Sequence, residues 1–276
     1  MRKSLTSVAV CVAMSSMLSS CNNSPKTSTN LVTTGFAVTG SGQNAVAQSG
    51  MQNLFSAFIP SAMALTPPLL IDSTGLAVNL NDAWIVVKEI EFESNETPGV
   101  GEVDGNETEF QGPFYVDLLS TSPVSFGDAQ VPASNIRRVK MKLHEADSIP
   151  VSAPAGLNGK SIFFSGTVNG VAFDYAADDS TELEIGGPNT IVPNSSQDML
   201  AVIRMADLFK KIDLSSIVAP TSISTSSRVP VANACPLIDA TANDLYTCFR
   251  KGLASEANFG NDNGDMDLDS NDDSVE

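Results

Sequence analysis

The sequence predicts a mainly β fold: an antiparallel β-sandwich with a C-terminal α-helix and disordered N- and C-terminal extensions. Short segments of alternating apolar and polar residues recur between Gly, Pro, Asn and Asp, and Val, Ile, Thr, Ser and Gly are plentiful. Runs with helical periodicity are scarce. Several short strands at such spacing are typical of two packed antiparallel sheets.

Changes in composition along the chain divide it into five parts. These are a signal segment over 1–20, a tether with a short apolar helix over 21–66, the sandwich over 67–214, a disulfide-linked helical extension over 215–260 and an acidic tail over 261–276. Within the tether, residues 22–50 are too polar to fold alone, although 31–39 form a β-like patch. Residues 51–65 place four apolar side chains on one helical face, which either packs on the domain or touches a membrane or partner.

The strands of the sandwich follow from alternation between turn residues. We expect them at 76–80, 83–93, 114–119, 136–144, 161–168, 171–175, 181–185 and 199–204. Residues 94–113, rich in Gly and acidic residues, are expected to form a long exposed loop. Asp207 is expected to cap a turn that runs to Ile212, and a Ser/Thr-rich link covers 215–227.

The firmest helical pattern lies near the C-terminus. Leu245, Cys248, Phe249 and Leu253 recur at helical spacing, which predicts a helix over about 241–257. Thr241 or Asp239 is its expected N-cap, and its apolar stripe is expected to dock on the sandwich.

The N-terminal segment ends in Leu18-Ser19-Ser20-Cys21, after two basic residues and an apolar run over 8–18. It resembles the lipobox of bacterial lipoproteins. The resemblance implies a diacylglycerol on the Cys21 sulfur, cleavage before Cys21 and a lipid anchor in the membrane. Asn22 in place of Asp after this cysteine resembles the signal for outer over inner membrane. The alternatives are an ordinary secretory signal or a short membrane anchor, although roughly a dozen apolar residues are too few to span a bilayer.

The charge balance argues against nucleic acid as a partner. The chain has 32 acidic and 15 basic residues, a net charge of −17, and the chain without 1–20 has 13 basic residues, so its net charge is 13 − 32 = −19. Such a chain is repelled by phosphate backbones and by anionic lipid headgroups, and no basic stripe interleaved with aromatic residues occurs in it.

Two cysteines remain once Cys11 leaves with the signal and Cys21 carries the lipid. In an oxidising compartment, Cys235 and Cys248 are expected to pair as a disulfide. A shared metal is the alternative, but His144 is the only histidine and no further cysteine exists to complete a site.

Four segments carry a family resemblance. "AWIVVKEIEFE", "GPFYVDLLS" with Asp117-Leu118-Leu119, "VPASNIRRVKMKLHEAD" and "LNGKSIFFSG" follow one another within about residues 69–187. This order resembles an uncharacterised β-sandwich domain of unknown function found in bacterial lipoproteins. The resemblance implies a fold and supplies no catalytic residues. The acidic 94–113 loop and the C-terminal extension depart from it.

Two strands carry alternating charges. Glu89, Glu91 and Glu93 share one face at intervals of roughly 6.6 Å, close to the carboxylate spacing of an inverting glycosidase. Any exposed strand with alternating glutamates has this spacing, and no GxSxG, P-loop or HExxH motif accompanies it.

The basic set alternates with a core-facing apolar set on the later strand. It consists of Arg138, Lys140, Lys142 and His144. It is either a solvated sheet face or a patch for an anionic polymer such as a glycan. We predict that the two strands are neighbours, with the three glutamates opposite Arg138, Lys140 and Lys142.

The acidic tail has the spacing of a calcium loop. Asp265, Asp267, Asp269, Asp273 and Glu276 match positions one, three, five, nine and twelve of an EF-hand. Ser270 stands where the loop requires Gly, and no exiting helix follows. We expect weak calcium binding at most, with a solvated acidic tail as the simpler alternative; no other cofactor is expected.

These patterns favour a non-enzymatic envelope lipoprotein. It would be lipid-anchored in the outer membrane, periplasmic or surface-exposed, and would bind an envelope protein or a glycan. The alternative is a carbohydrate-active hydrolase that uses exposed carboxylates.

Overall fold

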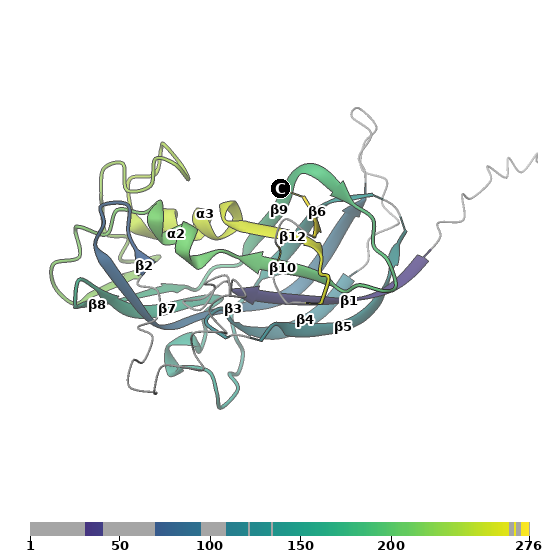
Figure 1. Ribbon diagram of the computed structural model, residues 1–276. Helices are drawn as coiled ribbons and strands as arrows, with labels where there is room; N and C mark the ends of the chain where they lie inside the picture. The colour runs from purple at the N-terminus through teal and green to yellow at the C-terminus, as the bar shows by residue number, and fades with distance from the viewer. Residues whose placement is uncertain are drawn as a thin grey trace, which may run out of the picture.

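The computed structural model describes residues 31–40, 70–94, 109–120, 122–133, 135–264, 268 and 272–275. It is mainly β, with two mixed sheets, one of which curls into a half-barrel (Figure 1). The strands are β1 Leu31–Gly40, β2 Leu70–Ile71, β3 Ala77–Ser94, β4 Glu109–Asp117, β5 Val124–Pro132, β6 Ile136–Leu143, β7 Ile162–Val168, β8 Val171–Ala177, β9 Thr181–Ile191, β10 Met199–Ile203, β11 Thr221–Ser224, β12 Ala257–Asn261 and β13 Asp273–Ser274. The helices are η1 Ala155–Leu157, α2 Met205–Lys210 and α3 Leu245–Ser255.

The larger sheet is built mostly from consecutive segments. Its order is β11-β8-β7-β3-β6-β9, and β2 and β4 also pair with the long strand β3. The strands expected at 83–93, 114–119, 136–144, 161–168, 171–175 and 181–185 all lie in it. Several run longer than expected: β4 begins at Glu109, inside the expected loop, and β9 continues to Ile191.

The smaller sheet joins segments that are far apart in the sequence. Its order is β13-β12-β10-β1-β5, and Figure 1 shows β1, β10 and β12 lying side by side. The expected strand at 199–204 is β10, whereas β5, β12 and β13 of this sheet, and β11 of the larger sheet, were not predicted. Strands are predicted from alternating apolar and polar residues, and these segments are too rich in polar residues and glycine to show that alternation.

The prediction of a purely antiparallel arrangement is wrong. β1 pairs with β10 in parallel, Phe36 beside Met199 and Gly40 beside Ile203, and β11 pairs with β8 in parallel. Parallel pairs need a connection that crosses back over the sheet, so alternation within a strand does not reveal them.

The prediction of disordered extensions is also wrong for the described parts of both ends. Leu31–Gly40 is an interior strand, and Phe36, 1% exposed, packs against the rings of Phe92, Phe110 and Phe126. At the other end β13 pairs with β12, and Val275 is buried in the same core. The sheet supplies the apolar partners that neither segment has by itself.

The C-terminal helix is confirmed, with a different start. α3 begins at Leu245, and its N-cap is Asp244, whose carboxylate accepts a hydrogen bond from the Thr247 N–H. Asp239 instead closes its own turn by accepting from the Thr241 N–H and hydroxyl. In α2, Asp207 lies in the first turn and is not the cap, because the helix begins two residues before it.

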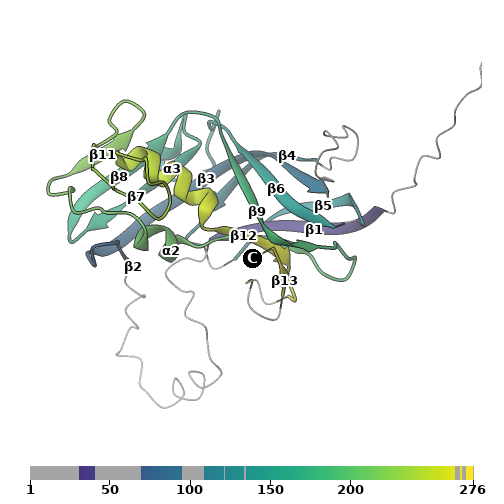
Figure 2. The ribbon, with the colours of Figure 1, turned by 90° about the horizontal axis from the view of Figure 1, so that it is seen from above.

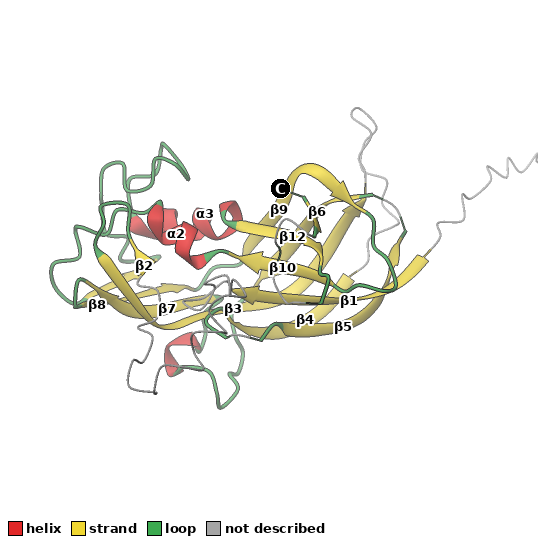
Figure 3. Ribbon diagram, in the orientation of Figure 1, coloured by secondary structure: helices red, strands yellow, loops and turns green. Residues whose placement is uncertain are grey.

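The two α-helices, α2 and α3, lie together at the end of the larger sheet where β7, β8 and β11 are found (Figures 2 and 3). Phe249 of α3 packs on Phe164 and Tyr175 of the sheet and on Phe209 of α2. The expectation that the apolar stripe of this helix docks on the β domain is therefore confirmed. The apolar segment 51–65 lies outside the described residues.

Candidate functional site

The charged face predicted from sequence exists. β3 and β6 are antiparallel neighbours, and their register places Glu89 opposite Lys142, Glu91 opposite Lys140 and Glu93 opposite Arg138. The apolar alternates of both strands belong to the core, so these charged residues point to the outer side of the sheet.

Ion pairs join the two rows of charge. Arg138 contacts Glu93 at 3.2 Å, and Lys142 contacts Glu89 at 3.3 Å and also pairs with Glu91. Lys140 pairs with Glu93. The hydrogen bond to Glu91 is the largest cause that raises the pKa of Lys142, and a second bond to Glu89 adds to it. Arg138, Lys140 and Lys142 are therefore held by carboxylates.

Strand β9 adds a second acidic row that the sequence reasoning missed. Glu182 lies opposite Lys142 and Glu184 opposite Lys140, and Glu184 reaches diagonally to Arg138 at 2.7 Å. The alternation in Thr181–Ile185 was the available signal, but it does not say which strand lies next to β9. A basic strand between two acidic strands results, which we call the charged face: Glu89, Glu91, Glu93, Arg138, Lys140, Lys142, Glu182 and Glu184.

Acid–base catalysis on the charged face has little support in this geometry. Glycoside hydrolysis requires two carboxylates that flank a substrate bond. Here each glutamate of β3 instead contacts a cation of β6. His144 lies beyond β6 and points its Nδ1 toward the Glu145 carbonyl oxygen at 3.2 Å, so it is not part of the ion-pair array.

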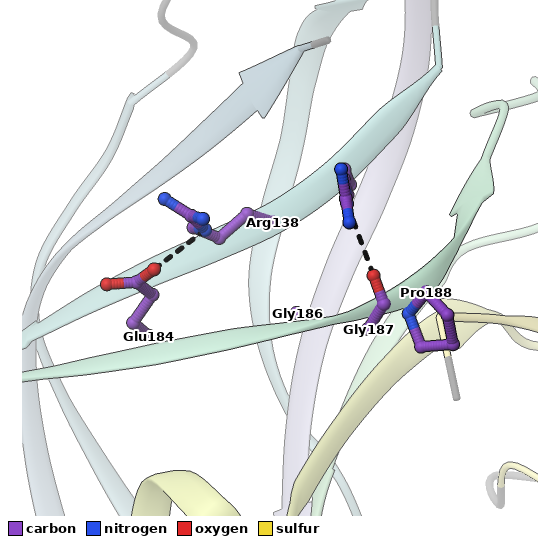
Figure 4. A pocket seen from close by; sticks show the side chains of 6 residues that line it. Arg138, Glu184, Gly186, Gly187 and Pro188 are labelled. Atoms are coloured by element: carbon purple, nitrogen blue, oxygen red, sulfur yellow. Dashed lines mark hydrogen bonds and ion pairs between the residues drawn. The ribbon is translucent and has the colours of Figure 1, made fainter. Parts of the chain in front are cut away.

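A hollow of about 480 Å³ opens at one end of the charged face. It is lined by Arg137, Arg138, Glu184, Gly186, Gly187 and Pro188. Figure 4 shows Arg138 and Glu184 joined by their ion pair, with the Gly186–Pro188 stretch of β9 beside them. Arg137 is exposed and donates from Nε to the Gly187 carbonyl oxygen at 3.3 Å.

The hollow arises from an irregularity between β6 and β9. Ile136 pairs with Ile191 but Arg138 pairs with Gly186, so four residues of β9 oppose a single residue of β6. Such bulges redirect side chains and are common next to functional sites. Here the bulge sends both Arg137 and Arg138 toward solvent, which simple alternation along β6 does not predict.

A second polar cluster connects α3 to the other end of the larger sheet. The Tyr246 hydroxyl donates to Asp179 at 2.6 Å, and Arg250 contacts Asp179 at 3.3 Å. The Tyr175 hydroxyl beside it is buried and has no hydrogen-bond partner among the residues that the structure describes, and this burial raises its pKa. The contacts of Tyr246 and Arg250 with Asp179 fasten the helix to the sheet.

The remaining predicted sites have mixed outcomes. The Cys235–Cys248 disulfide is present, with an S–S distance of 2.03 Å. Cys21 lies outside the described residues, as do Asp265, Asp267, Asp269 and Glu276 of the calcium hypothesis. Asp273 lies on β13 opposite Asn261. Within the described part of the chain, no three His, Cys, Asp or Glu residues are grouped as metal ligands.

Comparison with known proteins adds no identity. No family model, no curated protein and no solved structure matches the chain. Of the helices that the structure describes, none has the length and apolar character needed to cross a bilayer.

Proposed function

We propose that this chain is an envelope lipoprotein, anchored in the outer membrane by lipid on Cys21, with a non-enzymatic role in binding or assembly. Its partner would be an envelope protein or a glycan. The lipobox over 18–21 is the observation that carries the anchor. The Cys235–Cys248 disulfide supports an oxidising compartment on the same side of the membrane.

The charged face supports binding over catalysis. Its β3 glutamates and β6 cations contact one another, and this leaves a patterned surface rather than a free pair of carboxylates. The hydrolase alternative requires two converging carboxylates on either side of a substrate bond. We therefore place it second.

The proposal also includes the domain type. The four segments that resemble the lipoprotein-associated β-sandwich domain contribute β3, β4, β6 and β7, and all four strands lie in the larger sheet. β3 is bonded to each of the other three. This connected arrangement supports the assignment of residues 69–187 to one β-sandwich-like unit.

The anchor is tested by Cys21→Ala. We expect this variant to lose labelling by a palmitate analogue and to move from the membrane to the soluble fraction. Cys11→Ala is the matched control, because that cysteine lies within the segment expected to be removed. Unchanged labelling and membrane fractionation of Cys21→Ala would refute the anchor.

A further inference from the structure

We propose that the hollow beside Arg137 binds a phosphate group, and that the source is a lipid headgroup of the membrane that holds the anchor. The membrane part of this proposal rests on the proposed lipid at Cys21, whereas the phosphate part rests on the hollow alone.

Arg137 differs from the other cations of β6. Arg138 and Lys142 are each held by two carboxylates, and Lys140 pairs with Glu93. Among the described residues, Arg137 forms no ion pair and only its Nε is engaged, by the Gly187 carbonyl oxygen. Its two terminal nitrogens are thus open to an anion, and a guanidinium matches the geometry of phosphate oxygens.

The wall opposite the arginines is made of small residues. Gly186 lies directly across from Arg138, and a Cβ there would come within 3.1 Å of the Arg137 carbonyl oxygen and 3.5 Å of Arg138 Cγ. A side chain at this position would therefore crowd the wall of the hollow beside both arginines. An anion in the hollow would lie beside Arg137 and Arg138, with Glu184 as the competing carboxylate.

The hollow lies at the end of the molecule where the chain arrives from the anchor. Leu31, the first residue of β1, pairs with Pro132 of β5, and three residues separate Pro132 from Ile136, the start of β6. Figure 1 shows the start of β1 and the end of β5 on the same side of the molecule. Arg137 is the second residue of β6.

The reach of the chain limits how far this end can lie from the membrane. Leu31 is 31 − 21 = 10 residues from Cys21. Even a fully extended segment of that length spans at most about 35 Å. The net charge of 13 − 32 = −19 on the chain without residues 1–20 opposes approach to an anionic surface, but charges farther away than about 8 Å are largely screened at physiological salt, so the local arginines decide the contact.

The first experiment tests the hollow without a membrane. Inorganic phosphate is titrated into the full chain while the Nε–H signals of ¹⁵N-labelled arginine are followed. We expect the Arg137 signal to shift saturably, and Gly186→Ala, which keeps both arginines but adds a methyl group to the wall of the hollow, to weaken the response. Lys88→Gln removes an exposed cation of neighbouring β3 and should leave it unchanged. No saturable shift at Arg137 would overturn the proposal.

The second experiment identifies the source of the phosphate. The full chain with Cys21→Ser, so that no acyl chain contributes, is sedimented with vesicles of phosphatidylglycerol and phosphatidylcholine, and with phosphatidylcholine alone. One arginine at an anionic surface contributes about 1 kcal/mol, so Arg137→Gln should weaken binding to the anionic vesicles about fivefold, and Lys88→Gln should not.

The outcomes separate the two sources and the two proposals. If phosphate shifts the Arg137 signal but Arg137→Gln leaves vesicle binding unchanged, the hollow binds a soluble phosphate compound. That result would overturn the proposal that the ligand is a lipid headgroup. Failure of palmitate labelling at Cys21 would refute the anchor, yet neither the phosphate titration nor the comparison between vesicles depends on acylation.

Discussion

The two sheets share one core but differ on their outer sides. The larger sheet displays the charged face, in which cations and carboxylates lie side by side at a partly exposed surface. On the smaller sheet, the residues that alternate with the core positions are apolar: Leu200 and Val202, with Ala37 packed against them. Leu268, from the acidic segment after β12, covers them and is only 6% exposed.

This difference changes the interpretation of the C-terminal tail. Between β12 and β13 the chain brings Leu268 over the smaller sheet, and Val275, 1% exposed, then enters the main core. The tail is therefore part of the fold in its described residues, whatever its acidic side chains bind. On the outer side of the larger sheet the charged face has no such cover, whereas Trp84 and Val86 of β3 are buried against Ala146 and Leu157 in a separate apolar cluster.

The largest effect on this comparison is expected from Phe36→Ala. Phe36 is the only ring that β1 places in the core, and truncating a buried Phe costs about 3–5 kcal/mol. Denaturant unfolding should show this loss, whereas Leu31→Ala, 55% exposed on the same strand, should be nearly neutral. Equal small effects would mean that β1 is dispensable and that the larger sheet stands alone.

Loss of the disulfide should come next. Cys235 and Cys248 are 13 positions apart, and closing a loop of this size stabilises by about 3 kcal/mol. The bond secures the start of α3, which leads into β12 and so connects the two sheets. We expect the double Cys→Ala variant to unfold at lower denaturant concentration. Two free thiols in the mass of the non-reduced wild-type protein would contradict the pairing.

Leu268→Ala tests the cover on the smaller sheet. Burying a Leu side chain stabilises a fold by about 1.5–3 kcal/mol, so truncating Leu268 should lower the free energy of unfolding by about 2 kcal/mol. Leu237→Ala is the matched control, because Leu237 is 75% exposed. If both variants are equally stable, the tail does not contribute to the fold as we describe.

Glu93→Gln tests the charged face and should have a smaller effect. Ion pairs in solvent contribute about 0–1 kcal/mol and weaken as salt rises. The variant should be slightly less stable at low salt and indistinguishable from the wild type at high salt. Glu182, which forms no ion pair among the described residues, provides the control as Glu182→Gln. A large loss that is independent of salt would mean that the face is structural.

The smallest effect should appear only in acid. Hydrogen bonds from Lys251 first and from Thr241 next lower the pKa of Asp239 below its usual value near 4. Because the pKa is lower in the folded state than in the unfolded chain, the ionised carboxylate stabilises the folded state at pH values above the unfolded-state pKa. This stabilisation is lost as the pH falls toward the folded-state pKa. Between about pH 5 and about pH 3, Asp239→Asn should therefore lose less thermal stability than the wild type. Asp207→Asn, at an exposed site, is the control; identical pH profiles for all three proteins would contradict the prediction.

Much of the larger sheet could be predicted from the sequence. Over Glu89–Glu93 of β3 and Arg138–Leu143 of β6, apolar residues alternate with charged ones, so the two strands, their buried sides and the placing of the three glutamates opposite three cations followed from local pattern and charge. α3 was found for the same reason, since its apolar spacing is local. The resemblance to a lipobox and the pairing of the two remaining cysteines also required no structure.

Only the tertiary structure decided the smaller sheet and the hollow. β1 is polar enough to resemble a tether, and it becomes a strand because β5 and β10 supply hydrogen bonds on both sides. The open position of Arg137 depends on a bulge opposite Gly187, in a strand that is joined to β6 by long-range pairing. Local sequence determines which side chains a strand can present, but contacts between distant segments determine which strands form and which of their charges remain unpaired.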